Sequence, residues 1–218
     1  MIKIISFLSL TFFAISCTSD NIVTKEREEF YGIFKSLAKR NFSGQPKSSP
    51  AVVKRKTKSW LSKFKQPIIL VSSIDHKNQA TLIALGNNDE KLTWVSADGI
   101  SMTFDKGILI STRGYSQDLF SLRYKNPSEL FMHNKLTYKK VHRYLDGENK
   151  YNDLNFQCSA IKIPSREVQI LDYKLTVDRF IENCKGKRYN YKNEYDLLAG
   201  TSIVIISKQW ISPINQYF

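Results

Sequence analysis

The stretch LTWVSADGISMTFDKGILIST, from Leu92 to Thr112, decides the fold of this 218-residue chain. Strand-forming residues alternate with a period of two, and Asp98-Gly99 and Asp105-Lys106-Gly107 interrupt them. Asp-Gly supplies the positive φ angles of a type I′ turn, and a three-residue turn ending in glycine closes on a bulge. The stretch therefore predicts three consecutive antiparallel strands.

The same period extends to both sides of this stretch. We expect further strands at residues 68–73, 80–86, 136–145, 154–163, 166–171, 173–181, 189–197 and 202–210. Residues 115–135 break the pattern and indicate a turn or short helix around 127–131. The predicted fold class is mainly β: a curved antiparallel sheet, or an open barrel or sandwich, with one or two N-terminal helices.

The first residues form an export signal. Lys3 is followed by an apolar run from Ile4 to Ile15, which is shorter than the roughly 20 residues of a membrane span. Ala14-Ile15-Ser16-Cys17 resembles a bacterial lipobox, in which the cysteine is acylated (palmitate among the chains) and becomes the first mature residue. The alternative is an ordinary signal peptide with an incidental cysteine. We predict a signal peptide over 1–16 and lipid attachment at Cys17.

A helix and a linker are predicted between the lipid and the β domain. Residues 20–40 form an amphipathic helix and 41–50 a linker, so the domains are 17–50 and an antiparallel β domain over 51–218. Residues 53–65 form a second helix whose polar side is basic. This side either lies on an anionic membrane surface or faces water while the apolar side packs on the core. Its cations are Lys54, Arg55, Lys56, Lys58, Lys63 and Lys65.

Charge and cysteines agree with an exported protein. The net charge of +13 would suit binding to a polyanion, and because export makes nucleic acid unlikely, polyanions of the cell envelope remain. The alternative is that the charge only reflects a genome that favours lysine codons. Cys158 and Cys184 form an even pair, so a disulfide is expected in an oxidising compartment, with two free buried thiols as the alternative. The three histidines show no ligand spacing, and we expect no metal or cofactor.

The sequence contains no recognisable catalytic motif, and we expect a protein that is not an enzyme. Asp98 and Asp118 are read as turn-forming and capping residues. A glycan site is the preferred binding function, because aromatic faces stack on sugars and polar groups bind hydroxyls. Its candidates are Tyr189, Tyr191, Asn193, Tyr195, Arg113, Lys208 and Gln209. The alternative for the aromatic residues is a place in the core.

Several fragments together resemble the YjbF/GfcB lipoprotein family. They are Trp94-Val95-Ser96-Ala97-Asp98-Gly99, Gly107 to Gly114, Asp118-Leu119, Glu182-Asn183-Cys184, Asn193-Glu194-Tyr195 and Ser207 to Pro213. The resemblance implies an outer-membrane lipoprotein on the periplasmic face, made with group 4 capsule or exopolysaccharide machinery and without established enzymatic activity. Its implied partners are an anionic polysaccharide and export proteins. Two other functions stay open: an acyl-chain carrier in a half-barrel and, less favoured, a polysaccharide hydrolase.

Overall fold

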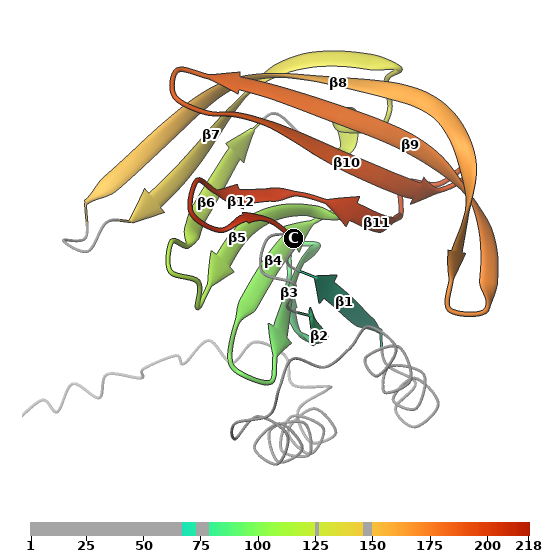
Figure 1. Cartoon of the computed structure of the whole chain (residues 1–218), viewed down its shortest axis with the longest axis horizontal. Helices are drawn as coiled ribbons and strands as arrows, with labels where there is room; N and C mark the ends of the chain where they lie inside the picture. Colours follow the sequence, from blue (N-terminus) through green and yellow to red (C-terminus); the bar gives the residue numbers. More distant parts are fainter. Residues whose placement is uncertain (1–66, 73–78, 125–126, 146–149) are drawn as a thin grey trace, which may run out of the picture.

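The computed structural model describes residues 67–72, 79–124, 127–145 and 150–218, which form antiparallel sheets curled into half-barrels (Figure 1). The first sheet has five strands in chain order: β1 (Ile68–Ser72), β2 (Gln79–Asn88), β3 (Lys91–Ser96), β4 (Ser101–Asp105) and β5 (Ile108–Arg113). This is the predicted meander, and Gly99 and Gly107 have the positive φ angles that its turns require. Mainly β architecture is therefore confirmed. The leader with Cys17, the expected helices and the basic residues 54–65 lie outside the described residues.

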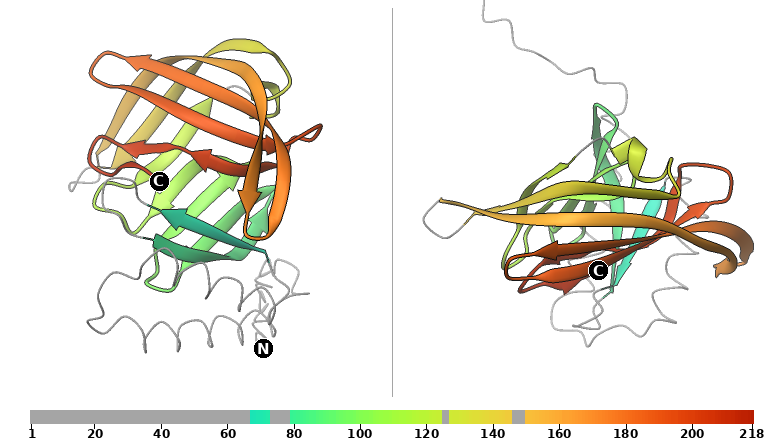
Figure 2. Two further views of the ribbon diagram at one scale, coloured as in Figure 1. Left: turned by 45° about the vertical axis from the view of Figure 1, so that its right-hand side comes forward. Right: turned by 90° about the horizontal axis from the view of Figure 1, so that it is seen from above.

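The second sheet has six strands in the order β11-β10-β9-β8-β7-β6 and arches over the first (Figure 2). Its strands are β6 (Leu119–Tyr124), β7 (Lys135–Leu145), β8 (Tyr151–Ile170), β9 (Tyr173–Gly186), β10 (Asn190–Leu198) and β11 (Val204–Lys208). One helical turn, α3 (Pro127–Leu130), joins β6 to β7 where a short helix was expected. A small hairpin of β12 (Trp210–Ser212) and β13 (Gln216–Tyr217) ends the chain.

Three details differ from the predicted strands. Strand β6 lies in the segment that seemed to break the pattern. Residues 154–163 and 166–171 belong to one strand, because Pro164 sits in a bulge between Ile163 and Arg166 where no ladder hydrogen bond is needed. The expected last strand divides at Gln209, whose backbone exchanges two hydrogen bonds with Phe218.

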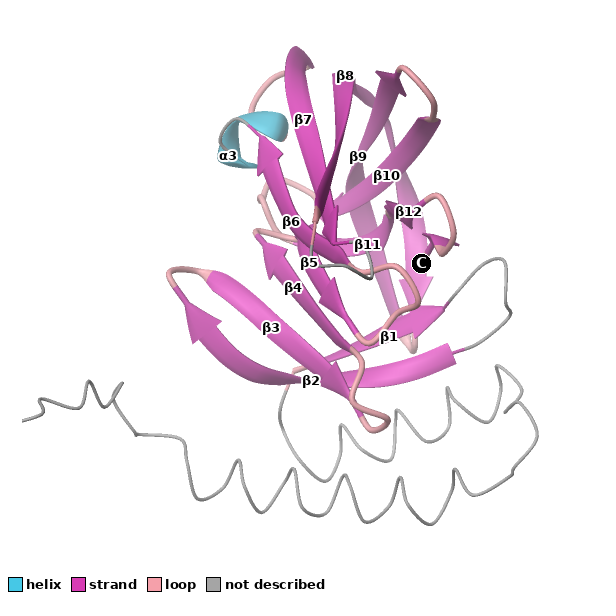
Figure 3. Cartoon of the chain, turned by 90° about the vertical axis from the view of Figure 1, so that its left-hand side faces the viewer, coloured by secondary structure: helices cyan, strands magenta, loops and turns pink. Residues whose placement is uncertain are grey.

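The C-terminal hairpin lies between the two sheets (Figure 3). On one side, Trp210 packs with Phe156, Tyr191 and Tyr195 under the large sheet. On the other, Ile211 packs with residues of both sheets, such as Met102 and Tyr144. Burying these side chains against each other joins the two half-barrels through one segment.

Gln209 connects this segment to the first sheet. Its Oε1 accepts a hydrogen bond from the Leu109 N–H at 2.8 Å, and its Nε2 donates to the Gly107 carbonyl at 2.8 Å. The side chain therefore pairs with β5 much as a neighbouring strand would. Gly107 is required at this crossing, because a Cβ there would lie 2.5 Å from the Val204 Cβ. Within the described part of the chain, no helix is long and apolar enough to cross a bilayer.

Candidate functional site

The seven residues proposed as a glycan site do not form one exposed surface. Tyr191, Asn193, Tyr195 and Gln209 are between 1% and 5% exposed. Their period of two does place three of them on one strand face, but that face of β10 points into the core. A sugar cannot stack on these rings in this structure, which corrects the expectation.

The other three candidates are accessible but lie apart. Tyr189 is 39% exposed at the edge of the core, with its ring 6.4 Å from that of Trp210. Lys208 places its Nζ 4.6 Å from the centre of the Tyr217 ring. Arg113 lies at the far end of β5 and is exposed.

A polar cluster fills part of the interior under the large sheet. Its centre is the Glu182 carboxylate, whose Oε1 lies 2.6 Å from the Lys140 Nζ, with side chains 0% and 1% exposed. The Tyr138 hydroxyl donates to Oε1, and the Asn193 and Tyr195 side chains donate to Oε2 at 2.7 and 3.2 Å. Burial, followed by the charge and hydrogen bond of Glu182, raises the pKa of Tyr138 well above its usual range. Every member is buried and paired, so the cluster is a fixed part of the core and cannot reach a ligand.

His142 continues this interior row along β7. The Tyr144 hydroxyl donates to the Ile211 carbonyl at 2.7 Å, so toward His142 Nδ1, at 3.3 Å, it can only accept. His142 Nε2 is then the acceptor for the Tyr191 hydroxyl at 2.8 Å. Burial and the nearby Lys140 charge lower the pKa of His142 well below its usual value, so the imidazole is neutral.

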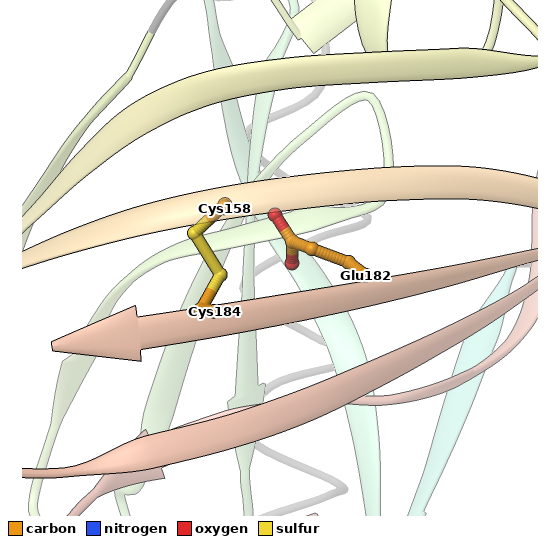
Figure 4. Close-up of side chains that lie close together, drawn as sticks. All are labelled: Cys158, Glu182 and Cys184. Atoms are coloured by element: carbon orange, nitrogen blue, oxygen red, sulfur yellow. A yellow bond between two sulfur atoms is a disulfide. The ribbon is translucent and has the colours of Figure 1, made fainter.

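The expected disulfide joins Cys158 on β8 to Cys184 on β9, and Glu182 lies beside it (Figure 4). The three side chains approach closely enough to suggest a metal site. Both sulfurs are, however, bonded to each other, and the carboxylate is already paired with Lys140. The disulfide is therefore a covalent link between the paired strands β8 and β9, and the ion pair of Glu182 with Lys140 joins β9 to β7 across β8.

The aspartates of the family-like fragments organise turns, as expected. Asp118 accepts hydrogen bonds from the Thr112 hydroxyl and from the backbone N–H groups of Gly114 and Tyr115, at 2.9 to 3.1 Å. Asp98 accepts a hydrogen bond from the Ser96 hydroxyl within the β3–β4 turn. Both carboxylates thus bond within their own turns, Asp118 to the backbone and Asp98 to the Ser96 side chain.

Exposed aromatic and basic side chains gather on the outer face of β6, β7 and β8. The Arg113 guanidinium lies 5.1 Å from the centre of the Phe120 ring, and Phe120 contacts Tyr151 with ring centres 5.6 Å apart. On Tyr151, which is 58% exposed, the Arg143 guanidinium lies 4.6 Å from the ring centre. Two cations and two rings therefore form a continuous stack at the surface.

Strand pairing extends this stack into a longer surface, which we call the outer strip. Along β7 and β8, Arg143 is paired with Asp153, Val141 with Asn155, and Lys139 with Gln157. Arg123 of β6 is opposite Val141 and shares the same face. The outer strip comprises Arg113, Phe120, Arg123, Lys139, Val141, Arg143, Tyr151, Asp153, Asn155 and Gln157.

A shallow depression lies at the Lys139 end of the outer strip. It has a volume of about 260 Å³, and its lining includes Lys139, Val141, Asn155 and Gln157. Within the described residues, no side-chain hydrogen bond or ion pair engages Lys139 or Asn155. Gln157 uses its Nε2 on the Tyr138 carbonyl at 3.2 Å, which leaves its Oε1 as an acceptor. The depression therefore offers a cation and amide groups side by side.

Asp153 holds two of the arginines in place. Arg143 Nε and Nη2 each lie 2.7 Å from an Asp153 oxygen, and Arg123 Nη2 lies 3.1 Å away. The hydrogen bonds from Arg143 lower the pKa of Asp153, which stays ionised at neutral pH. The outer strip thus carries four cations and one carboxylate, with a clear positive excess.

Sequence reasoning found Arg113 but missed the rest of the outer strip. Arg143, Tyr151 and Asn155 occur in a run where aromatic and charged residues alternate, and either set could face the core. Pairing Leu145 with Tyr151 puts these residues on one face, and that face is outside because the residues between them in each strand, such as Tyr144, pack in the core.

These features define a mainly β domain of antiparallel sheets curled into half-barrels. The family described as "Group 4 capsule polysaccharide lipoprotein gfcB, YjbF" matches residues 49–217. The chain therefore belongs to this family, as the sequence resemblance indicated. Its fold is similar to the crystal structure of the hypothetical lipoprotein YmcC from Escherichia coli (K12), with a TM-score of 0.58 and 12% sequence identity. That similarity covers 77% of this chain and 93% of the other. A search of curated protein sequences gives no match.

Proposed function

We propose that this protein is a lipid-anchored accessory factor for capsule or exopolysaccharide production, on the periplasmic face of the outer membrane. Membership of a capsule polysaccharide lipoprotein family is the observation that carries the proposal. The leader ending in Ala14-Ile15-Ser16-Cys17 supports acylation of Cys17 as the anchor. The factor acts by binding rather than by catalysis, with the polysaccharide or an export protein as its partner.

The interior of the domain favours a binding role over the carrier role. A carrier requires a wide apolar cavity on the concave face of the sheet. In the part of the chain that the structure describes, this face is occupied by packed rings and by the polar cluster around Glu182. Tyr191 and Trp210, for example, stack with ring centres 4.6 Å apart.

Gene deletion with complementation tests the proposal. Deletion should lower surface polysaccharide, the wild-type gene should restore it, and Cys17→Ser should restore it only in part. Labelling with radioactive palmitate should mark the wild-type protein and leave Cys17→Ser unlabelled, and fractionation should find the wild type in the outer membrane. Unchanged surface polysaccharide after deletion would refute a capsule role, and full complementation by Cys17→Ser would refute the need for the anchor.

A further inference from the structure

The outer strip is suited to a long ligand that carries negative charge. Residues 151–157 of β8 run along it, and seven residues of a strand extend over roughly 20 Å. Its stacked rings lie at one end, and the depression with Lys139, Asn155 and Gln157 lies at the other. We propose that the outer strip binds an acidic polysaccharide, of the class that carries carboxylate groups on its sugars.

The ring end provides a platform for the apolar face of a sugar. Tyr151 has more than half of its surface exposed, and its contacts with Phe120 and Arg143 hold the ring in place. A ring that is already fixed loses little conformational freedom when a ligand stacks on it. This arrangement therefore favours a saccharide over a simple counter-ion.

The arginines provide recognition of carboxylate groups. Arg113 makes its hydrogen bonds to Ser111, Thr112 and Leu119 through Nη1 alone, so its Nε and Nη2 keep donors for a ligand. Guanidinium donors match the geometry of a carboxylate better than a single ammonium does. Arg143 already uses its Nε and Nη2 donors on Asp153, so it contributes positive charge and holds the Tyr151 ring rather than binding a carboxylate with both donors.

The depression provides hydrogen bonds to hydroxyl groups. At about 260 Å³ it lies just below the roughly 300–1,000 Å³ of pockets for drug-sized ligands, which suits one sugar unit of a longer chain. The Asn155 amide can donate and accept, and Gln157 Oε1 can accept. Val141 lines the depression as an apolar surface. A membrane surface would need none of these amide groups, so the combination favours a glycan over anionic lipid.

Binding of the full-length protein in detergent micelles to polygalacturonate tests this inference, with neutral dextran as the comparison. We expect the wild type to bind polygalacturonate, with an affinity that falls as the salt concentration increases, and not to bind dextran. Arg113→Gln and Lys139→Gln should each weaken binding roughly two- to fivefold, because each removes one exposed ionic contact. Tyr151→Ala should weaken it roughly two- to tenfold, because it removes the stacking platform.

A matched double variant controls for net charge. Lys91→Gln with Lys174→Gln removes two exposed cations elsewhere, on β3 and β9, and should bind like the wild type. Arg113→Gln with Lys139→Gln should bind clearly less. Equal binding by the two doubles, binding of dextran, or binding only to phosphatidylglycerol vesicles would overturn the inference.

The inference rests on the proposed function, and two results separate their failures. If deletion lowers surface polysaccharide but the outer-strip double complements fully and still binds polygalacturonate, the function stands and the site is wrong. If the outer-strip double loses both polygalacturonate binding and complementation while the Lys91 and Lys174 double retains both, the site is supported. If deletion changes nothing while the outer strip still selects polygalacturonate, the capsule role fails and the binding site stands.

Discussion

Replacing Lys140 by methionine should destabilise the protein strongly, because it leaves the Glu182 carboxylate buried without its counter-ion. The two charged groups are 2.6 Å apart and almost completely excluded from water. Removing one partner of such a pair costs about 3–5 kcal/mol. Typical domains are stable by only about 5–15 kcal/mol, so the variant should lose a large share of its stability.

Urea denaturation of the full chain, followed by tryptophan fluorescence, measures this loss. Trp94 and Trp210 are both buried and lie in different hydrophobic clusters, so their signals follow both halves of the domain. Lys139→Met is the matched control. Lys139 is next to Lys140 in β7, but its side chain is exposed on the opposite face of the strand, so this variant should change the free energy of unfolding by less than about 0.5 kcal/mol.

A double variant tests whether the pair acts as a unit. Lys140→Met with Glu182→Gln leaves no buried charge, and the one carbonyl oxygen of the glutamine still offers an acceptor to either Tyr138 or Tyr195, which donate to different oxygens of Glu182. It should therefore lose less stability than the two single variants added together. The reasoning is refuted if Lys140→Met costs less than about 1 kcal/mol, or if the double variant loses the full sum.

Three further predictions concern the rest of the interior. Gln209→Ala should lower the free energy of unfolding, measured by urea denaturation, by about 1–3 kcal/mol for each of the two backbone groups that it leaves unpaired, the Leu109 N–H and the Gly107 carbonyl. Gln169 is exposed, so Gln169→Ala should cost little. Equal losses in the two variants would contradict a stabilising role for the Gln209 hydrogen bonds. Replacing Cys158 and Cys184 together by alanine should cost roughly 3 kcal/mol for a sequence separation of 26, and an unchanged midpoint would exclude a stabilising disulfide. Because the pKa of His142 is lowered in the folded protein, the unfolded chain binds more protons than the folded one below about pH 6.5. As the pH decreases below this value, the free energy of unfolding should therefore fall by up to about 1.4 kcal/mol per pH unit. His142→Asn should flatten this slope, whereas His133→Gln, at an exposed histidine, should leave it unchanged.

The local signals in the sequence were sufficient for most of the fold. Alternation and turn residues placed the β1–β5 meander, because register in a half-buried sheet is set by the pattern of the strands and by the turns. Pro164 suggested a strand end because proline has no N–H to donate to the hydrogen-bond ladder of a sheet. In the structure it lies in a bulge, where no such donor is needed, and the strand continues. Strand β6 was missed because its pairing with β7 involves a register shift between Leu119 and Ser121.

The site was less predictable, because alternation identifies two faces of a strand without saying which is buried. Lys139 and Lys140 are adjacent and chemically identical, yet one faces the outside and the other pairs with Glu182 in the core. The same ambiguity placed Tyr191 and Tyr195 in a hypothetical glycan site. The face that is buried is the one that packs on another part of the chain: Trp210, near the C-terminus, packs on the face of β10 that carries Tyr191 and Tyr195.

The family fragments and the outer strip divide the molecule into a scaffold and a surface. In Thr112-Arg113-Gly114, Thr112 is buried and bonded to Asp118, and Gly114 has a positive φ angle, so both serve the turn. Arg113 stands between them and points to Phe120 on the outer strip. Thr112 and Gly114 therefore hold the turn, while Arg113 between them presents its Nε and Nη2 donors on the outer strip. If the outer strip binds glycan, Arg113→Gln should lower polygalacturonate affinity with only a small loss of stability from its exposed hydrogen bonds, whereas Asp118→Asn should lower stability before it affects binding.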